Sequence, residues 1–553
     1  MPETTSGTLP HTSVSPAPTD VAPLARTGSL LRFMLRRDRI RLSIWVLGIG
    51  LMALYFSNAI QVIADGVEEL AQMAVLFSDP VGRMMTGPAF GMDEPSFERF
   101  YAAGYVLFLY ILFALMSVFL LVRHTRTEEQ TGRAELVRAN VVGRHATLTA
   151  ALLLTGGANA AAAVLVWVAS GPVAGYDAAG TALVAAGGFS VGLFFMGAAA
   201  VAAQLSQSSR GASAMAGGLL GLAYLIRMGG DMVEQGGSAL SWFSPLAWSQ
   251  QTAPYVEDRW WPLLLPLVAA AGMVALGFWL STRRDVGASL VPPRLGRATA
   301  RPSLGTPVGM ALRVLRGMLR GWAIALVLAA LMFGSYAESM VDAADGLPEE
   351  VAMIMTGDDL MLGYLAYMSL FLAIFVAAAG VSGLQVLRSE EVHGRAEFAL
   401  SLPMSRTTWL GAHLAVLLGG LMALTLLVGL GTAVGAGASL GDLEHTGSLL
   451  LAGLHQFPAV LAVVGIVVAL FGWVPRIAGT VGWVIIAFSG IATNFGPMLD
   501  LPDAVLNLNV FGHLAQHPVE DITLAPVLWL STLGVAGLVL GLLGWRRREV
   551  NRV

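Results

Sequence analysis

The sequence predicts an all-α integral membrane protein with twelve transmembrane helices. Three observations support this: a mean hydropathy of +0.70, a charged fraction of only 12%, and twelve apolar stretches of about twenty residues, the length that crosses the hydrocarbon core as a helix. A soluble chain of 553 residues would carry about twice that charged fraction. The net charge of −4 provides no basic field that would favour nucleic acid as a partner.

Six of the apolar stretches lie in each half of the chain. Those of the first half lie near residues 42–63, 101–122, 146–170, 181–203, 212–228 and 262–281. Those of the second half lie near residues 321–341, 360–386, 408–436, 449–472, 477–494 and 523–544. The positive-inside rule tests this count, because a wrong number of spans would scramble the charge of alternate loops. With a cytoplasmic N-terminus, only Arg83, Arg99, Arg227 and Arg259 of the 32 basic residues are external, so both termini are predicted to be cytoplasmic.

The two halves of the chain repeat. Residues 126–135 read RTEEQTGRAE and residues 388–397 read RSEEVHGRAE, with seven of ten positions identical. Each half has an even number of predicted spans, so both are expected to face the same way, as a parallel repeat. The predicted segments are a disordered cytoplasmic tail over 1–27, a first six-helix half over 28–285, a Pro- and Arg-containing cytoplasmic linker over 286–309 and a second six-helix half over 310–553.

An amphipathic helix is predicted before the first span of each half. Leu31, Met34 and Leu35 share one helical face, with arginines on another. The counterpart begins at Thr306 and Pro307, a helix cap followed by proline at the first helical position. Such helices either lie in the membrane interface with their arginines at anionic headgroups or dock a cytoplasmic partner, and the sequence leaves both open.

The duplicated motif lies in the predicted cytoplasmic loop between the second and third spans of each half. Two acids followed by Gly and Arg suit a short helix that inserts into a groove on another protein, with the acids near its N-terminus. A solvated loop is the alternative, which the duplication between otherwise diverged halves disfavours. The motif residues are Glu128, Glu129, Gly132, Arg133 and Glu135 in the first half and Glu390, Glu391, Gly394, Arg395 and Glu397 in the second.

Few other residues of the sequence suggest a functional site. His455 and Gln456 lie inside the tenth predicted span, where an ionisable residue is a candidate for the transport pathway, although a hydrogen bond between helices explains it equally well. The chain contains no cysteine, and no catalytic or metal site is expected. It also contains no lysine, so the phosphate-binding loop GxxxxGK[ST] cannot occur. If this protein uses ATP, another chain must bind it.

The second copy of the motif, continued through Leu402, Pro403 and Met404, resembles the cytoplasmic signature of the ABC-2 type permeases. In that family a pattern E-x-x-x-G-T/R-x-E is followed by a leucine-rich turn and a proline before the third span. The first copy has Val141 where the proline would stand. The fusion of two halves is similar to the actinobacterial permeases identified as polyketide antibiotic, or tetronasin-type, exporters.

The resemblance implies a permease subunit of an ATP-driven exporter that moves hydrophobic small molecules, such as antibiotics or drugs, out of a bacterial cell across its plasma membrane. The loops around Glu128 and Glu390 would be coupling helices that contact two copies of a separate P-loop ATPase. ATP and Mg would bind to that partner, and the permease would hold no cofactor and catalyse no reaction. The family also implies external re-entrant segments, here near Trp242 and Phe511.

Two other classes of protein remain as alternatives. A proton-coupled secondary multidrug transporter of the major facilitator type also has twelve spans in parallel halves and a repeated loop motif. That motif centres on Asp-Arg-x-Gly-Arg-Arg, which the paired glutamates do not match, and the external stretch 64–100 is long for the class. An integral-membrane enzyme acting on lipids is disfavoured, because no acid pair or histidine cluster is predicted at a cytoplasmic membrane face.

Overall fold

The computed structural model describes residues 22–64, 66–285, 287–291, 296, 298–338, 359–495 and 502–549. Within these ranges all regular secondary structure is helical, and twelve helices are long and apolar enough to cross a membrane. The prediction of an all-α membrane protein with twelve spans is therefore confirmed. Most of the tail predicted over residues 1–27 lies outside the described residues.

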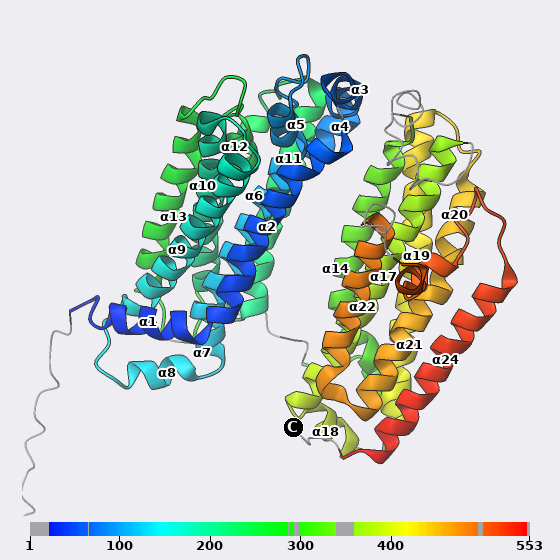
Figure 1. Cartoon of the computed structure of the whole chain (residues 1–553). Helices are drawn as coiled ribbons and strands as arrows, with labels where there is room; N and C mark the ends of the chain where they lie inside the picture. The colour runs from blue at the N-terminus through cyan, green and yellow to red at the C-terminus, as the bar shows by residue number, and fades with distance from the viewer. Residues whose placement is uncertain are drawn as a thin grey trace, which may run out of the picture. The chain divides into compact units, whose positions relative to one another are not determined.

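The helices form two compact units (Figure 1). The first unit comprises Met1–Val62 and Arg83–Leu295, and the second comprises Ile63–Gly82 and Gly296–Val553. The division follows the sequence repeat except over residues 63–82, which come from the predicted external loop after the first span and pack with the second unit. This segment contains helix α3 (Val67–Ser78).

The first unit is a bundle around helix α10. Its longer helices are α1 (Thr27–Arg37), α2 (Arg39–Ile63), α5 (Phe97–Gly104), α6 (Val106–Val122), α9 (Ala146–Val168), α10 (Ala178–Leu205), α11 (Ser209–Val233) and α13 (Leu264–Ser281). Helix α10 begins after Asp177, whose carboxylate accepts hydrogen bonds from the backbone N–H groups of Ala179 (2.8 Å) and Gly180 (3.1 Å). It packs against α6, α9, α11 and α13. The Tyr110 side chain of α6 lies against Gly187 of α10 and leaves no room for a Cβ there, a close approach that small residues permit.

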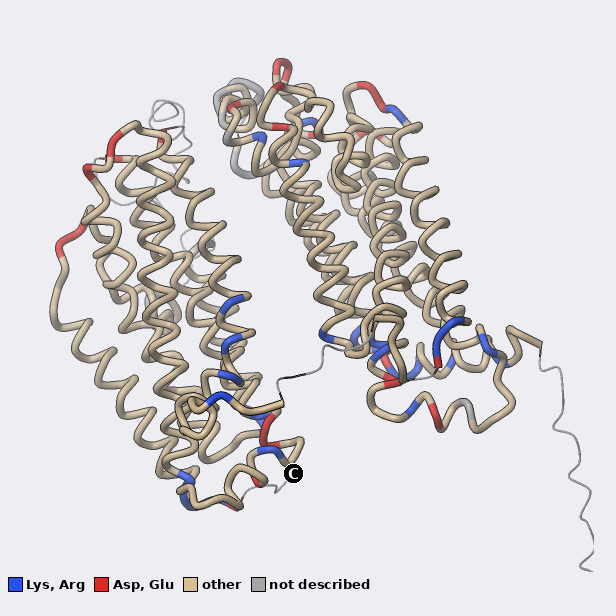
Figure 2. Tube along the Cα trace, turned by 180° about the vertical axis from the view of Figure 1, so that it is seen from behind, with Lys and Arg blue, Asp and Glu red and all other residues tan. Residues whose placement is uncertain are grey.

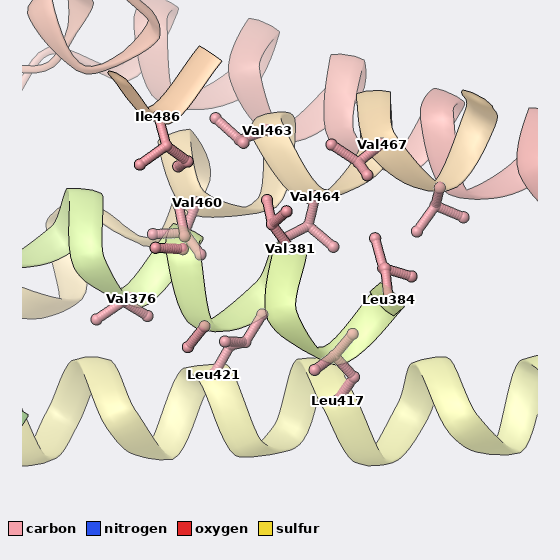
Figure 3. Close-up of a cluster of buried hydrophobic side chains, with 14 of the residues drawn as sticks. Val376, Val381, Leu384, Leu417, Leu421, Val460, Val463, Val464, Val467 and Ile486 are labelled. Carbon is pink, nitrogen blue, oxygen red and sulfur yellow. The ribbon is translucent and has the colours of Figure 1, made fainter. Parts of the chain in front are cut away.

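The second unit has a core to which most of its helices contribute. Its longer helices are α14 (Pro307–Ser335), α17 (Leu360–Val392), α19 (Arg406–Leu440), α20 (Thr446–His455), α21 (Phe457–Trp473), α22 (Pro475–Phe495) and α24 (Leu524–Arg547). Val464 of α21, Val381 of α17 and Leu421 of α19 are buried together in an aliphatic layer (Figure 3). On another face of α21, Gly465 meets Gly534 of α24 with the two backbones in contact. The α21–α24 pair is thus held by close backbone packing.

The two halves differ in the helix that precedes the first span. In the first unit α1 ends at Arg37 and the direction changes at Asp38, whose carboxylate is bound by Arg123 (2.7 and 2.8 Å) and approached by His124 (3.0 Å). In the second unit, α14 begins at Pro307, as its cap predicts, and continues through the seventh span without a break. No acid occurs in α14 to make the equivalent contact, so the amphipathic segment expected there as a separate helix is the first part of a transmembrane helix.

Short helices occupy the positions expected for the re-entrant segments. In the first unit these are η3 (Ser241–Phe243) and α12 (Pro245–Gln250), between the last two spans. The second unit has η7 (Val510–His513) at the corresponding place. Ser244 starts α12 by accepting hydrogen bonds from the backbone N–H groups of Leu246 and Ala247, ahead of the proline at the first helical position.

We expect Gly465→Leu to lower the melting temperature of the purified protein strongly. The added side chain would force α21 and α24 apart, and overpacking of this kind costs about 3 kcal/mol. Gly419→Leu is the matched control, because Gly419 on α19 is exposed and no atom of the protein would contact its Cβ. Equal melting temperatures for the two variants, measured in the same detergent, would contradict the proposed close packing.

Candidate functional site

The two copies of the duplicated motif turn the chain at the same glycine. In the first unit, α6 continues through the turn η1 (Arg123–Thr127) and α7 (Glu128–Gln130) to Gly132, after which α8 (Arg133–Arg138) begins. In the second unit, α17 continues to Val392, and α18 (Arg395–Leu400) begins after Gly394. Gly132 and Gly394 have φ values of +73° and +72°, in the left-handed region that favours glycine. The motif glycine therefore turns the chain from a long helix into a short one.

The paired glutamates lie before the glycine turn. The sequence pattern predicted them in the short helix, which begins after that turn. Glu128 and Glu129 form part of α7, and Glu390 and Glu391 lie in the last turns of α17. They do not lie at the N-terminus of the short helix, where only Glu135 or Glu397 lies. The expectation was wrong because the left-handed glycine separates the motif into two helices.

The second glutamate of each pair binds two arginines. Glu129 contacts Arg126 at 2.8 Å and receives two hydrogen bonds from Arg284, at 2.6 and 2.9 Å. We call this group the Glu129 clamp. Arg284 follows α13, the last span of the unit, and Arg126 lies at the end of the second span. The clamp therefore joins the ends of two spans that are far apart in sequence.

The same arrangement recurs in the second unit. Glu391 contacts Arg388 at 2.7 Å and receives two hydrogen bonds from Arg548, at 2.6 and 2.9 Å. We call this group the Glu391 clamp. Glu391 is fully buried, and bidentate pairing with a guanidinium is the strongest arrangement open to a carboxylate. Sequence reasoning did not assign a role to Arg284 and Arg548, although both belong to a second repeated pattern, Arg-Arg-acid-Val, at the end of each half.

The first glutamate of each pair distinguishes the two copies. Glu128 receives two hydrogen bonds from Arg37 of α1, at 2.8 and 3.0 Å, and lies 3.8 Å from Arg133 of its own motif. Glu390 pairs with Arg395 of its own motif, at 2.8 to 3.0 Å. The first copy is therefore fixed to the amphipathic helix, whereas the ion pair of Glu390 stays within the motif.

The short helices each expose one large apolar side chain. Leu136 of α8 is 72% exposed and Phe398 of α18 is 76% exposed, and the two occupy equivalent positions of the repeat, 262 residues apart. Ala134 and Ala396 are buried on the opposite side and hold each helix against its unit. Leu136 and Phe398 therefore leave an apolar side chain on the same face of each short helix open to contact with another molecule.

The second unit also has a cavity beside its short helix. Its volume is about 540 Å³, and it is lined by the start of α14, by α18 and by the start of α19, with Met310, Met404 and Trp409 among the walls. In the first unit, the segment before α1 is hydrogen-bonded to the segment just before α9. The backbone N–H groups of Gly143 and His145 donate to the carbonyl oxygens of Ala25 (3.1 Å) and Pro23 (3.0 Å).

The remaining candidates lie elsewhere. His455 and Gln456 are buried where α20 ends and α21 begins, and neither His455 Nε2 nor Gln456 Oε1 has a hydrogen-bond partner among the described residues. Their role in the pathway stays a prediction. In the described part of the chain, no group of three or more His, Asp or Glu side chains could hold a metal ion.

Arg83 and Arg227, two of the arginines expected on the external side, join α11 to the segment around residues 83–84, a role that the sequence did not reveal. Arg83 donates hydrogen bonds to the carbonyl oxygens of Asp231 (2.9 Å) and Met232 (3.0 Å). Arg227 is fully buried in α11 and donates to the carbonyl oxygen of Met84. These arginines tie α4 (Pro80–Thr86) to the end of α11, which explains why they depart from the positive-inside pattern.

Comparison with known proteins identifies the family. The family model "Multidrug efflux system permease Rv1217c, C-terminal domain" matches residues 28–280 and 304–546. The chain belongs to this permease family. It is 36% identical over 535 residues to the multidrug efflux system permease protein Rv1217c of Mycobacterium tuberculosis (strain ATCC 25618 / H37Rv), an alignment that covers 95% of each chain. The permease match extends over both units and includes both copies of the motif.

Substitution of the two adjacent glutamates should separate their roles. We expect Glu391→Gln to destabilise the protein by about 3 kcal/mol, because it leaves two arginines around a buried position without their counter-charge. Glu390→Gln should cost less than about 1 kcal/mol, because its partner Arg395 is half exposed. Thermal unfolding of both purified variants measures the difference, and a larger effect at Glu390 would refute the clamp.

Proposed function

We propose that the protein is the transmembrane permease subunit of an ABC-2 type exporter, which moves hydrophobic small molecules such as antibiotics or drugs out of a bacterial cell. Three observations support this proposal: membership of the multidrug efflux permease family, twelve candidate spans, and a duplicated helical loop at one end of each unit. Since the chain has no lysine and hence no GxxxxGK[ST] loop, ATP hydrolysis is assigned to a separate subunit.

The distribution of charge supports an orientation in the membrane. In each unit the arginines gather toward the end that carries α8 or α18, and many of the acids lie at the opposite end (Figure 2). We call the first of these the arginine-rich end. By the positive-inside rule it faces the cytoplasm. We therefore propose that the motif loops and both termini are cytoplasmic, in the plasma membrane of a bacterium.

The single observation that carries the proposed coupling to an ATPase is the pair of equivalent exposed residues Leu136 and Phe398. A few well-packed residues near the centre of an interface carry most of its binding energy. Two equivalent anchors favour two copies of the same partner, here a P-loop ATPase that binds ATP and Mg. The cavity beside α18 offers an adaptable apolar surface, lined by Met310 and Met404, for a side chain of that partner.

The clamps supply a route from the partner to the bundle. Glu129 and Glu391 join the helix before each short helix to the end of the last span of the same unit. A displacement of α8 or α18 by the ATPase would therefore move the second and last spans together. In this proposal Glu129 and Glu391 act as positioning residues, and the exposed side chains make the contact.

The alternatives have less support. The hypothesis of a secondary transporter of the major facilitator type rested on the number of spans and on a repeated loop. Neither feature distinguishes that class from the permeases. The family match does not favour it.

The proposal is tested by isolating the tagged chain from its native host in mild detergent. We expect a P-loop ATPase to co-purify, and Phe398→Ser and Leu136→Ser each to weaken its retention by about 30-fold in affinity, the effect of losing about 2 kcal/mol at an anchor. Phe243→Ser is the matched control, because Phe243 is 73% exposed and lies between the last two spans, away from the motif.

Two outcomes would contradict the proposal. One is a chain that is recovered alone and whose transport follows a proton gradient, which would favour a secondary transporter. The other is unchanged ATPase retention in both motif variants, which would place the contact elsewhere on the permease.

A further inference from the structure

The second unit contains a cavity of about 460 Å³ at its arginine-rich end. It lies between the end of α17, the end of α21 and the start of α22, and is separate from the cavity beside α18. Two arginines, Arg388 and Arg476, contribute to its wall, and no acid occurs among the described residues that line it. The wall of the cavity is therefore basic, and it lies at the ends of the spans.

Arg388 has donor groups that the protein does not use. Of its guanidinium nitrogens, Nη1 donates to Glu391 at 2.7 Å, and the structure records no hydrogen bond from the other two. The equivalent Arg126 in the first unit is saturated: Nε and Nη2 donate to the carbonyl oxygen of Ala203, and Nη1 donates to Glu129 and to the carbonyl oxygen of Ala288. The arginine at this position of the repeat therefore uses all its donors within the protein in the first half and has free donors in the second.

Arg476 adds a second available guanidinium. It is exposed, and among the described residues it makes no hydrogen bond or ion pair. It lies in the first turn of α22, where unsatisfied backbone N–H groups and the helix dipole also favour an anion. Two arginines at such a position suit the oxygens of a phosphate group, which guanidinium binds in a bidentate manner.

Apart from Gln385 and Thr480, the other side chains that line the cavity are apolar. Leu384, Val467 and Phe471 form part of its wall. Trp483 lies seven residues after Arg476 on α22, about 10 Å along the helix axis, and is 39% exposed. A basic residue at the interface with an aromatic ring one to two turns deeper is the usual arrangement of a membrane anchor. A ligand that uses both must have an anionic head and an apolar tail.

We propose that this cavity binds the headgroup of an anionic phospholipid from the cytoplasmic leaflet. The phosphate lies between Arg388 and Arg476, and the first part of an acyl chain runs along Trp483. Because Arg388 also belongs to the Glu391 clamp, the bound lipid supplies a second counter-charge beside that clamp. The equivalent cavity of the first half, about 770 Å³ in volume, differs from it: Glu129 lines its wall, and all three nitrogens of its arginine, Arg126, are bonded within the chain.

The test compares lipids and variants on the full chain. Purified protein in detergent is titrated with phosphatidylglycerol and, separately, with phosphatidylcholine, while the melting temperature is followed. We expect phosphatidylglycerol to raise the melting temperature more, and Arg476→Gln to weaken the apparent affinity for phosphatidylglycerol about fivefold, the effect of losing about 1 kcal/mol per arginine at a membrane surface. Arg547→Gln is the matched control, because Arg547 is an exposed arginine at the end of α24 that makes no ion pair among the described residues and does not line the cavity.

Fluorescence locates the bound lipid. Phosphatidylglycerol with brominated acyl chains quenches nearby tryptophans, and the quenching should fall in Trp483→Phe but not in Trp260→Phe, a similarly exposed tryptophan of the first unit. Equal responses to the two lipids, or equal losses in Arg476→Gln and Arg547→Gln, would overturn the proposal in favour of general surface charge. Equal stabilisation by millimolar inorganic phosphate would overturn it in favour of a free-anion site. None of these outcomes depends on an ATPase partner.

Discussion

A carboxylate held between two guanidinium groups organises the arginine-rich end of each half. Glu129 and Glu391 each bind one arginine from the end of the second span and one that follows or ends the last span. A buried charge of this kind is stable only when its partners are in place, because the desolvation cost is offset by nothing else. The position of the loop, the turn at Gly132 or Gly394 and the exposed face of the short helix all depend on this interaction.

The duplicated motif has acquired different surroundings in the two halves. In the first, Arg37 of α1 binds Glu128, and Arg126 is saturated by backbone carbonyls. In the second, the amphipathic segment is part of α14, and Arg388 keeps unused donors. Cavities lie beside the motif in both halves, but the motif arginine is fully bonded within the chain only in the first. Such a difference allows two equivalent docking surfaces to be coupled to bundles that respond differently.

The hydrocarbon environment explains where polar groups are tolerated. Backbone groups within the spans are satisfied by helices, so the spans can approach through glycines such as Gly465 and Gly534. Charged side chains in the described residues are concentrated at the helix ends. One buried pair, Arg227 and Asp231, lies near the end of α11, where the arginine also binds a backbone carbonyl. Both ends of the first unit are thus held by arginines, through carboxylates at one end and mainly through carbonyls at the other.

The sequence alone determined the twelve spans, the repeat and the start of α14 at Pro307, because hydropathy, helix length and capping act over a few residues. It also identified the motif residues. Only the tertiary structure decided that Glu391 is buried while Phe398 is exposed, and that the short helix begins after the left-handed glycine, which leaves the acids in the preceding helix. The partners Arg284 and Arg548 lie about 155 residues from their glutamates. Ion pairs over such separations depend on how helices pack, which no local pattern encodes.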